Sequence, residues 1–188
     1  LVDPLTALAE EVAACRACPR LVAWREQVAR ERRAAFRDEE YWARGVPGFG
    51  DPAARVLLVG LAPAAHGANR TGRAFTGDRS GDFLYASLQL YGEPAESLVD
   101  GLQLRGVWIT ATVRCAPPGN KPLPEERDRC RPFLEREWAL LTEVRAVVAL
   151  GAFAYQAVAG LTGLRPRPRF GHGVEVALPG GRTLVCSF

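Results

Sequence analysis

The sequence predicts an α/β fold in which helices pack against a parallel sheet, and three observations support this prediction. Four short segments are almost continuously apolar, as strands buried on both faces of a sheet should be. Segments with helical patterns lie between them. The chain has 188 residues, enough for one domain with a sizeable core. Strands that alternate with helices in this way form right-handed βαβ units.

The expected strands and the helices between them can be placed along the chain. The strands cover residues 55–60, 106–113, 145–151 and 183–188. The helices cover residues 81–92, 124–144 and 152–163, with Pro124 in a first-turn position and Gly163 at a stop. A turn at residues 179–181 predicts that residues 172–188 also form a short hairpin.

A helical extension is expected before the first strand. Residues 5–15 and 21–36 have helical patterns, and residues 46–52 form a loop rich in glycine and proline. No linker or internal repeat follows them. We therefore expect residues 1–54 to be an N-terminal extension of a single domain that spans residues 1–188.

Composition and charge exclude several classes of protein. The N-terminal helix lacks the basic and uninterrupted apolar regions of a signal peptide, and the longest apolar stretch, residues 146–161, is too short to span a bilayer. We therefore expect a soluble, cytoplasmic protein. Because the sequence lacks an initiator methionine and stops within an expected strand, we also expect the natural sequence to extend beyond both ends. The net charge of +3 is too small to indicate a polyanionic partner. Lys121 is the only lysine, so almost all of the basic residues are arginines. Arginine suits contacts with phosphates, but a coding bias of the gene is an alternative explanation for this composition.

Three loops are expected to meet at one edge of the sheet. Ligands of open parallel sheets bind outside the carboxyl ends of the strands. Residues 60–81 follow the first strand, residues 110–122 the second, and residues 151–156 the third. We therefore expect these loops to converge on one pocket.

Four of the five cysteines are candidate ligands of a metal or a cluster. Cys15 and Cys18 form a C-x2-C pair, and Cys115 and Cys130 are separated by 14 residues. Because nothing indicates secretion, metal or redox chemistry is favoured over disulfides. Spacing alone leaves an iron-sulfur cluster, a zinc site and unligated buried thiols open. Cys186 lies in an apolar strand and is expected to be a core residue.

The segment after the first strand, GLAPAAHGANRTGRAFTGDRSG (residues 60–81), is rich in glycine and polar residues. Gly60, Gly67, Gly72 and Gly77 permit positive φ angles and let backbone N–H groups approach a ligand. A glycine-rich loop that opens a helix also suits a nucleotide phosphate. The segment nevertheless matches neither the G-x-G-x-x-G pattern nor a P-loop.

Three features together resemble the iron-sulfur uracil-DNA glycosylases, most closely family 5 (type B). They are GLAPAAHGANRTGRAFTGD (residues 60–78), VRCAPPGNKP (residues 113–122) and the cysteines Cys15, Cys18, Cys115 and Cys130. The resemblance runs from Cys15 to the last strand. It implies a three-layer α/β/α sandwich with a central four-stranded parallel sheet. It also implies a 4Fe-4S cluster on the four cysteines, and DNA with a deaminated base as the substrate.

The resemblance implies roles for two residues of the glycine-rich segment. Breaking an N-glycosidic bond passes through an oxocarbenium-like sugar while negative charge moves onto the departing base. Asp78 is implied to position or activate the attacking water, although an aspartate there also suits the N-cap of the following helix. Phe75 is implied to stack on the flipped base, and packing of the loop onto the core is its alternative.

Other residues are implied to bind the base or the DNA backbone. The further candidates for the base pocket are Gly60, Leu61, Ala62, His66 and Asn120. His66 also suits a local hydrogen bond, and Asn120 also suits a turn. Arg70 and Arg73 are candidates for contacts with DNA phosphates, or are solvated loop residues. Asn69 is expected to brace the loop.

The sequence departs from the pattern of related enzymes. Family 4 enzymes carry a glutamate after the first strand's glycine and an asparagine at the end of the second strand, where this chain has Leu61 and Ala111. Apolar residues cannot pair with the uracil edge, so we expect the pocket also to accept hypoxanthine or xanthine. Family members continue after the fourth strand with a motif that begins at a histidine. This sequence ends at Phe188, where the motif should begin, and His172 is not expected to replace it.

The sequence therefore predicts a monomeric, cytoplasmic DNA-repair glycosylase that removes uracil and other deaminated bases by hydrolysis. It should be monofunctional, because Lys121, flanked by Asn120 and Pro122, is not placed to form a Schiff base. Two alternatives stay open. One is an iron-sulfur or zinc protein that binds DNA without cleaving the bond, and the other is an α/β protein that binds nucleotide phosphates.

Overall fold

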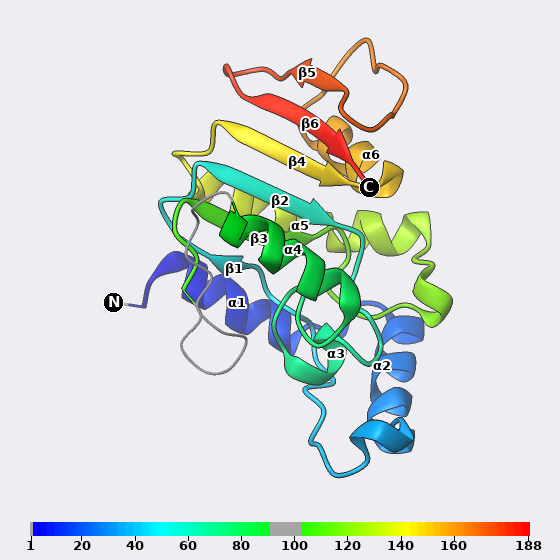
Figure 1. Ribbon diagram of the computed structural model, residues 1–188. Helices are drawn as coiled ribbons and strands as arrows, with labels where there is room; N and C mark the ends of the chain where they lie inside the picture. Colours follow the sequence, from blue (N-terminus) through cyan, green and yellow to red (C-terminus); the bar gives the residue numbers. More distant parts are fainter. Residues whose placement is uncertain (1, 91–102) are drawn as a thin grey trace.

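The computed structural model describes residues 2–90 and 103–188, and these contain a six-stranded sheet in the order β1-β3-β2-β4-β6-β5 (Figure 1). The strands are β1 (Phe49–Gly50), β2 (Val56–Gly60), β3 (Val107–Ala111), β4 (Ala146–Leu150), β5 (Glu175–Ala177) and β6 (Thr183–Ser187). The central strands β3, β2, β4 and β6 are parallel, whereas β1 and β5 are antiparallel edges. The expectation of four strands is correct for the parallel centre, and the full sheet has two more.

The two edge strands differ in how far the sequence predicts them. The β5–β6 hairpin is the one predicted from the turn at residues 179–181, and Val176 pairs with Leu184 in it. The sequence does not predict β1, because two residues are too short to show a strand pattern. β1 exists because Phe49 and Gly50 pair with β3.

The helices follow the expected order along the chain. They are α1 (Pro4–Ala14), α2 (Pro19–Glu31), α3 (Ala68–Thr71), α4 (Arg79–Leu90), α5 (Pro124–Leu140) and α6 (Ala152–Leu161), with 3-10 turns at Ala34–Phe36 and Pro118–Asn120. α3 and the 3-10 turns are too short for periodicity to reveal them. Pro124 begins α5 as predicted. Tyr91 and Gly92, the end of one expected helix, lie outside the described residues.

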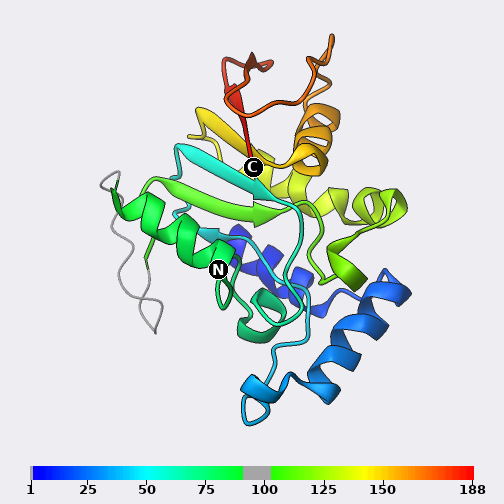
Figure 2. The ribbon, with the colours of Figure 1, turned by 45° about the vertical axis from the view of Figure 1, so that its right-hand side comes forward.

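Helices cover both faces of the sheet, so the structure is the predicted three-layer α/β/α sandwich (Figures 1 and 2). One core cluster joins α1, α5 and α6 to the sheet through residues such as Leu5, Leu134 and Tyr155. A second cluster joins α3 and α4 to β2 and β3 through Ala68 and Tyr85. Because α4 lies over β2 and β3, every second residue of β4 and β6 is only half-buried.

A buried ion pair fixes the chain just after β3. Both terminal nitrogens of Arg114 donate to the Glu137 carboxylate of α5, at 2.8 and 2.6 Å. The Thr110 hydroxyl donates to the same carboxylate at 2.8 Å, and all three residues are almost completely buried. Cys186 is fully buried in the core, as predicted. None of the described helices is long and apolar enough to cross a membrane.

Candidate active site and cysteine cavity

A pocket of about 370 Å³ opens where the loops after β2 and β3 meet, at the carboxyl ends of these strands. Its lining includes residues 64–67, Gly77 and Asp78 from the first loop, and Pro117, Gly119 and Asn120 from the second. Pockets of this size are typical of small-ligand sites. The expected convergence of these two loops is therefore present, whereas residues 151–156 do not line this pocket.

The N-terminal extension supplies a wall of the pocket that sequence reasoning missed. This wall consists of Trp24 in α2, Arg33, and Phe36 in the following 3-10 turn. Nothing in the sequence links these residues to the glycine-rich loop, because the contact joins segments about 40 positions apart.

The two oxygens of the Asp78 carboxylate have different surroundings. Oδ1 accepts hydrogen bonds from the Ser80 hydroxyl and, at 3.0 Å, from the Gly81 N–H, so Asp78 caps α4. Oδ2 lies so close to Gly67 that a Cβ at that glycine would overlap it. Oδ2 accepts no hydrogen bond from the part of the chain that the structure describes. Asp78 therefore caps α4 through Oδ1, as the alternative to a catalytic role expects, and Oδ2 is left at the pocket wall.

His66 lies in the pocket wall with one ring nitrogen already in use. The Tyr41 hydroxyl lies 2.9 Å from Nδ1 of His66. Burial, with the positive charges of Arg33 and Arg70, lowers the pKa of His66 below its usual value. The ring is therefore neutral near pH 7. The tautomer that accepts a hydrogen bond from Tyr41 carries its proton on Nε2.

Arg70 and Arg73 make contacts within the protein. Arg70 forms an ion pair with Glu39 and donates to the carbonyls of His66 and Gly77 at 2.9 and 3.3 Å, and its side chain is only 12% exposed. The guanidinium of Arg73 lies 4.9 Å from the centre of the Phe49 ring. These contacts favour bracing of the loop for Arg70, and phosphate binding stays a prediction for both arginines.

Phe75 lies over the end of β2 and outside the pocket lining. A Cβ at Gly60 would stand 2.6 Å from Cζ of Phe75, so the ring tip lies directly on the glycine. The ring also packs against the core cluster under α4, as the packing alternative expects. Leu61 and Ala62 follow Gly60 and are half-buried, and neither lines the pocket.

Two candidate residues have unusual backbone conformations. Phe75 and Asn120 both have a φ of 55°. Asparagine tolerates this left-handed region, so Asn120 suits the turn that it forms, but a phenylalanine there is an outlier. Asn69 braces the loop as predicted, because its fully buried amide donates to the carbonyls of Arg25 and Ala65 at 3.3 and 3.2 Å.

The four candidate cysteines line one small cavity. Cys15 and Cys18 reach it from the link between α1 and α2, Cys115 from the loop after β3, and Cys130 from α5. Burial raises the pKa of the Cys18 and Cys115 thiols, and that of Cys130 to about 12. Among the described residues, no group of three or more His, Cys, Asp or Glu side chains is placed so that it could hold a metal ion.

Arg25 links the cysteine cavity to the glycine-rich loop. This arginine is 1% exposed, and its terminal nitrogens donate to Sγ of Cys115 at 2.9 Å and to the carbonyl of Cys15 at 3.0 Å. Its own carbonyl accepts from the Asn69 side chain. One residue of α2 thus contacts both the cysteines and a residue that braces the pocket loop.

Comparisons with known proteins agree with this arrangement. The family model of the uracil DNA glycosylase superfamily matches residues 47–186. A type-5 uracil-DNA glycosylase of Thermus thermophilus is 56% identical over 186 residues, which cover 97% of this chain and 84% of that protein. A type-5 uracil-DNA glycosylase of Mycobacterium tuberculosis is 56% identical over 183 residues, which cover 93% of this chain and 68% of that protein.

The chain is also similar, at lower identity, to type-4 uracil-DNA glycosylases. A type-4 uracil-DNA glycosylase of Pyrobaculum aerophilum is 35% identical over 127 residues, which cover 67% of this chain and 59% of that protein. The type-5 relatives are more similar and match more of the chain. The chain therefore belongs to the uracil-DNA glycosylase superfamily and, within this family of DNA glycosylases, to the type-5 branch.

Proposed function

We propose that this chain hydrolyses the N-glycosidic bond of uracil in DNA and leaves an abasic site, acting as a monomer in the cytoplasm. The observation that carries the proposal is the meeting of His66, Asp78 and Asn120 in one pocket at the carboxyl edge of a parallel sheet. Type-5 membership supports the same activity. A base inside a duplex cannot reach such a pocket, so the uracil must be flipped out of the helix.

Asp78 is the group that we propose to act on the water. Its Oδ1 is held by the cap of α4, so the carboxylate is oriented before substrate binds. Oδ2 has no protein donor among the described residues and can accept a hydrogen bond from water at C1′ of the sugar. The negative charge also stabilises the oxocarbenium-like transition state. In the tautomer whose Nδ1 accepts from Tyr41, His66 carries its proton on Nε2 and is suited to donate a hydrogen bond to the base or to a phosphate.

Replacing Asp78 by asparagine separates catalysis from capping. Asparagine caps helices as well as aspartate does, so Asp78→Asn should leave the free energy of unfolding nearly unchanged. We expect uracil release under single-turnover conditions to slow by about 100-fold or more, because proton transfer and charge stabilisation are lost. Affinity for a duplex with an abasic-site analogue should be retained.

Asp82→Asn is the matched control, because Asp82 is an exposed aspartate in the first turn of the same helix. It removes the same charge without touching the pocket. Equal rates for the Asp78→Asn, Asp82→Asn and unaltered proteins would reject the role of Asp78. An unaltered protein that binds damaged DNA but releases no base would reject the glycosylase itself.

The base pocket is proposed to form around Phe75 and the backbone of Gly60, Leu61 and Ala62. Backbone strain of about 1–3 kcal/mol per residue is common where a ligand is held, and Phe75 has such a conformation. A base stacked on this ring would meet an apolar side chain at Leu61 and no asparagine at Ala111. Asn120 places a side-chain amide in the lining of the pocket.

A base pocket with apolar side chains at Leu61 and Ala111 should discriminate weakly among deaminated bases. We expect hypoxanthine and xanthine to be released from duplex DNA at rates within about tenfold of uracil, because no buried polar partner is left unpaired by the wrong base. Single-turnover rates for the three lesions in one sequence context measure this. Release of uracil alone would contradict it.

The cysteine cavity is proposed to hold a 4Fe-4S cluster on Cys15, Cys18, Cys115 and Cys130. Four thiolates are the usual donor set of such a cluster. Tetrahedral zinc, which needs all four sulfurs about 2.3 Å from one ion, is the alternative occupant of the same four thiols. A bound cluster would supply structural cross-linking, and hydrolysis requires no electron from it. The Arg25 guanidinium would donate a hydrogen bond to one of its ligands.

A further inference from the structure

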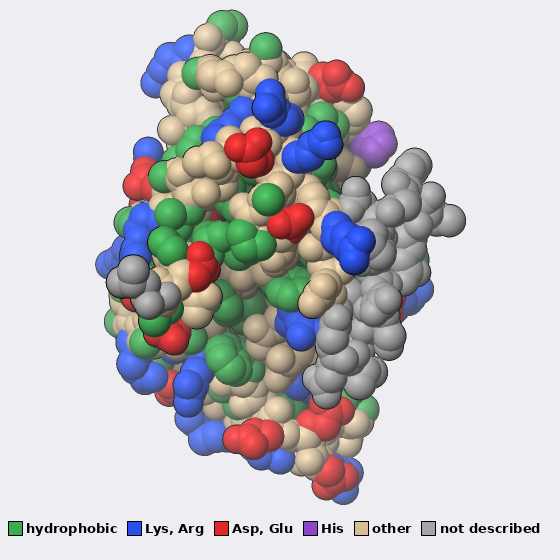
Figure 3. All heavy atoms as spheres, turned by 90° about the vertical axis from the view of Figure 1, so that its left-hand side faces the viewer, with side chains coloured by type: hydrophobic (Ala, Val, Ile, Leu, Met, Phe, Trp, Pro, Cys, Tyr) green, Lys and Arg blue, Asp and Glu red, His purple; other side chains and the backbone are tan. Residues whose placement is uncertain are grey.

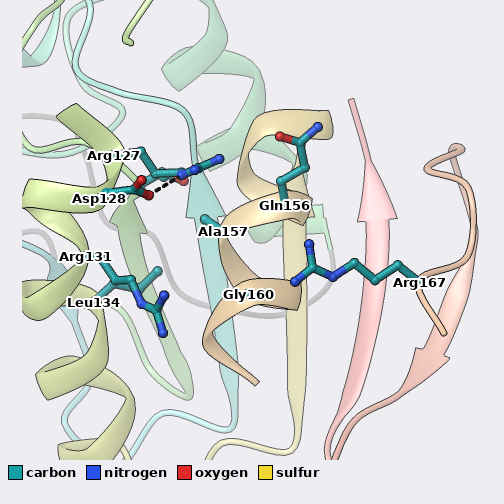
Figure 4. Close-up of a pocket in the computed structure, with 9 residues that line it drawn as sticks. Arg127, Asp128, Arg131, Leu134, Gln156, Ala157, Gly160 and Arg167 are labelled. Carbon is teal, nitrogen blue, oxygen red and sulfur yellow. Dashed lines mark hydrogen bonds and ion pairs between the residues drawn. The ribbon is translucent and has the colours of Figure 1, made fainter. Parts of the chain in front are cut away.

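A second cavity, of about 350 Å³, lies between α5 and α6 and does not include any residue of the candidate active site (Figure 4). Arg127, Asp128 and Arg131 line it from α5, and Gln156 lines it from α6. Arg167 reaches back from the loop after α6 toward Gly160. Three arginines from two separate segments therefore surround one groove, together with a single acidic residue.

The terminal nitrogens of these three arginines are available. Arg127 pairs with Asp128 at 2.9 Å and Arg131 with Glu135 at 2.7 Å, in both cases through Nε. The one hydrogen bond of Arg167, to the Leu164 carbonyl at 3.4 Å, also uses Nε. The Nη groups have no hydrogen-bond partner among residues 2–90 and 103–188. Exposed ion pairs contribute only about 0–1 kcal/mol, so an anion can readily replace the carboxylates.

The segment that carries Arg167 adds further positive charge. Arg165, Arg167 and Arg169 alternate with prolines and are all exposed. None of them forms an ion pair within the described part of the chain. Proline fixes the backbone φ, so Pro166 and Pro168 reduce the conformational freedom that this arginine-rich segment would lose on binding. At the opposite end of the strands, basic and acidic side chains are interspersed (Figure 3).

The groove adjoins the edge of the sheet where the candidate active site lies. Thr112, which lines the groove, donates its hydroxyl to the carbonyl of Gly60 at 2.9 Å. The guanidinium of Arg127 lies 5.8 Å from the centre of the Phe153 ring, and Phe153 packs in the same small cluster as Ala62. The groove is therefore a neighbour of Gly60 and Ala62, the backbone around which the base pocket is proposed to form.

The chemistry of the lining indicates a phosphate group. Arginine forks match phosphate oxygens in pairs, and the Gln156 amide offers further donors. The groove has no aromatic side chain on which a nucleobase could stack. These features fit a backbone phosphate better than a free nucleoside.

We propose that the groove between α5 and α6 binds a phosphate of the DNA strand that flanks the lesion, with Arg131 and Arg167 as its main ligands. The identity of the polyanion rests on the proposed glycosylase function. Binding here would supplement the active site, so it should govern affinity for DNA and leave the chemical step unchanged.

The salt dependence of DNA binding tests this proposal. Each lost phosphate contact should reduce the slope of log K against log salt by about 1 in magnitude. Anisotropy titrations use the full chain and a labelled duplex with an abasic-site analogue. The double variant Arg131→Gln/Arg167→Gln should bind about 10- to 100-fold more weakly at physiological salt. Its slope should be smaller by about 1. At saturating substrate its rate of uracil release should be unchanged.

Arg136→Gln provides a matched control. Arg136 is on the same helix and forms an exposed ion pair with Glu11, but it does not line the groove. Arg136→Gln removes one positive charge, as each substitution of the double variant does, together with one surface ion pair, and it should keep the slope of the unaltered protein. Thermal melts of all variants verify that each is folded.

The outcomes separate this inference from the proposed function. Equal slopes of log K against log salt for the double variant and Arg136→Gln would overturn the proposal that the groove binds a DNA phosphate. A loss of inorganic phosphate binding in calorimetry, with DNA binding unchanged, would also overturn it by making the groove a small-anion site. If the groove variants lose DNA affinity while the unaltered protein releases no base, DNA binding by the groove is supported and the proposed glycosylase activity is rejected.

Discussion

At Gly60 the end of β2 contacts the ring of Phe75, and there is no room for a Cβ atom between the Gly60 backbone and the ring. A methyl group there would lie 2.6 Å from Cζ of Phe75 and would push the ring away. We expect Gly60→Ala to lower the free energy of unfolding by about 1–3 kcal/mol, as overpacking does. The displaced ring should also lower kcat/KM for uracil release by about 5- to 100-fold, the value of one stacked base. Urea unfolding and single-turnover assays measure the two effects.

A second substitution ties both effects to the ring. In a Phe75→Leu background the Cζ atom is absent, so adding Gly60→Ala should cost less than it does alone, which a double-mutant cycle detects. For the free energy of unfolding, Gly160→Ala is the control, because a Cβ there meets nothing within 4 Å and alanine favours the helix. Additive costs in the cycle would show that Gly60 and Phe75 do not act together.

The elements of this fold divide into those with a local signal and those without one. β2, β3, β4 and β6 are predictable because each is an apolar run of about five residues. β1 depends on pairing with β3, and α3 is a single turn, so neither has a periodicity to detect. The three-layer arrangement then follows from the alternation of strands and helices.

The candidate site divides in the same way. The loops after β2 and β3 meet because parallel strands place their carboxyl ends together, which the sequence predicts. The contribution of α2 is different, since Trp24 and Arg25 reach the pocket and the cysteines through contacts that no local pattern encodes. The groove between α5 and α6 depends on Arg167 folding back across a helix, which is likewise a tertiary contact.

Across the whole molecule, the cysteine cavity joins segments that are far apart in sequence. The link between α1 and α2, the loop after β3, and α5 all contribute to it. A cluster there would close loops of up to about 100 residues, and the free energy of metal binding would add to the free energy of folding. The metal should therefore control the stability of the entire chain, including the pocket loop braced through Arg25 and Asn69.

Two cysteine substitutions test whether a bound cluster stabilises the whole chain. Cys130→Ser should lose iron and the visible absorption of a thiolate-bound cluster, whereas Cys186→Ser, in the core away from the cavity, should keep both. Each buries a hydroxyl and lowers Tm somewhat, so Tm alone does not separate them. The response to a chelator does: it should lower the Tm of the unaltered protein and of Cys186→Ser by several degrees, and leave Cys130→Ser unchanged. Iron retained by Cys130→Ser would exclude that ligand, and stoichiometric zinc without iron in the unaltered protein would replace the cluster by a zinc site.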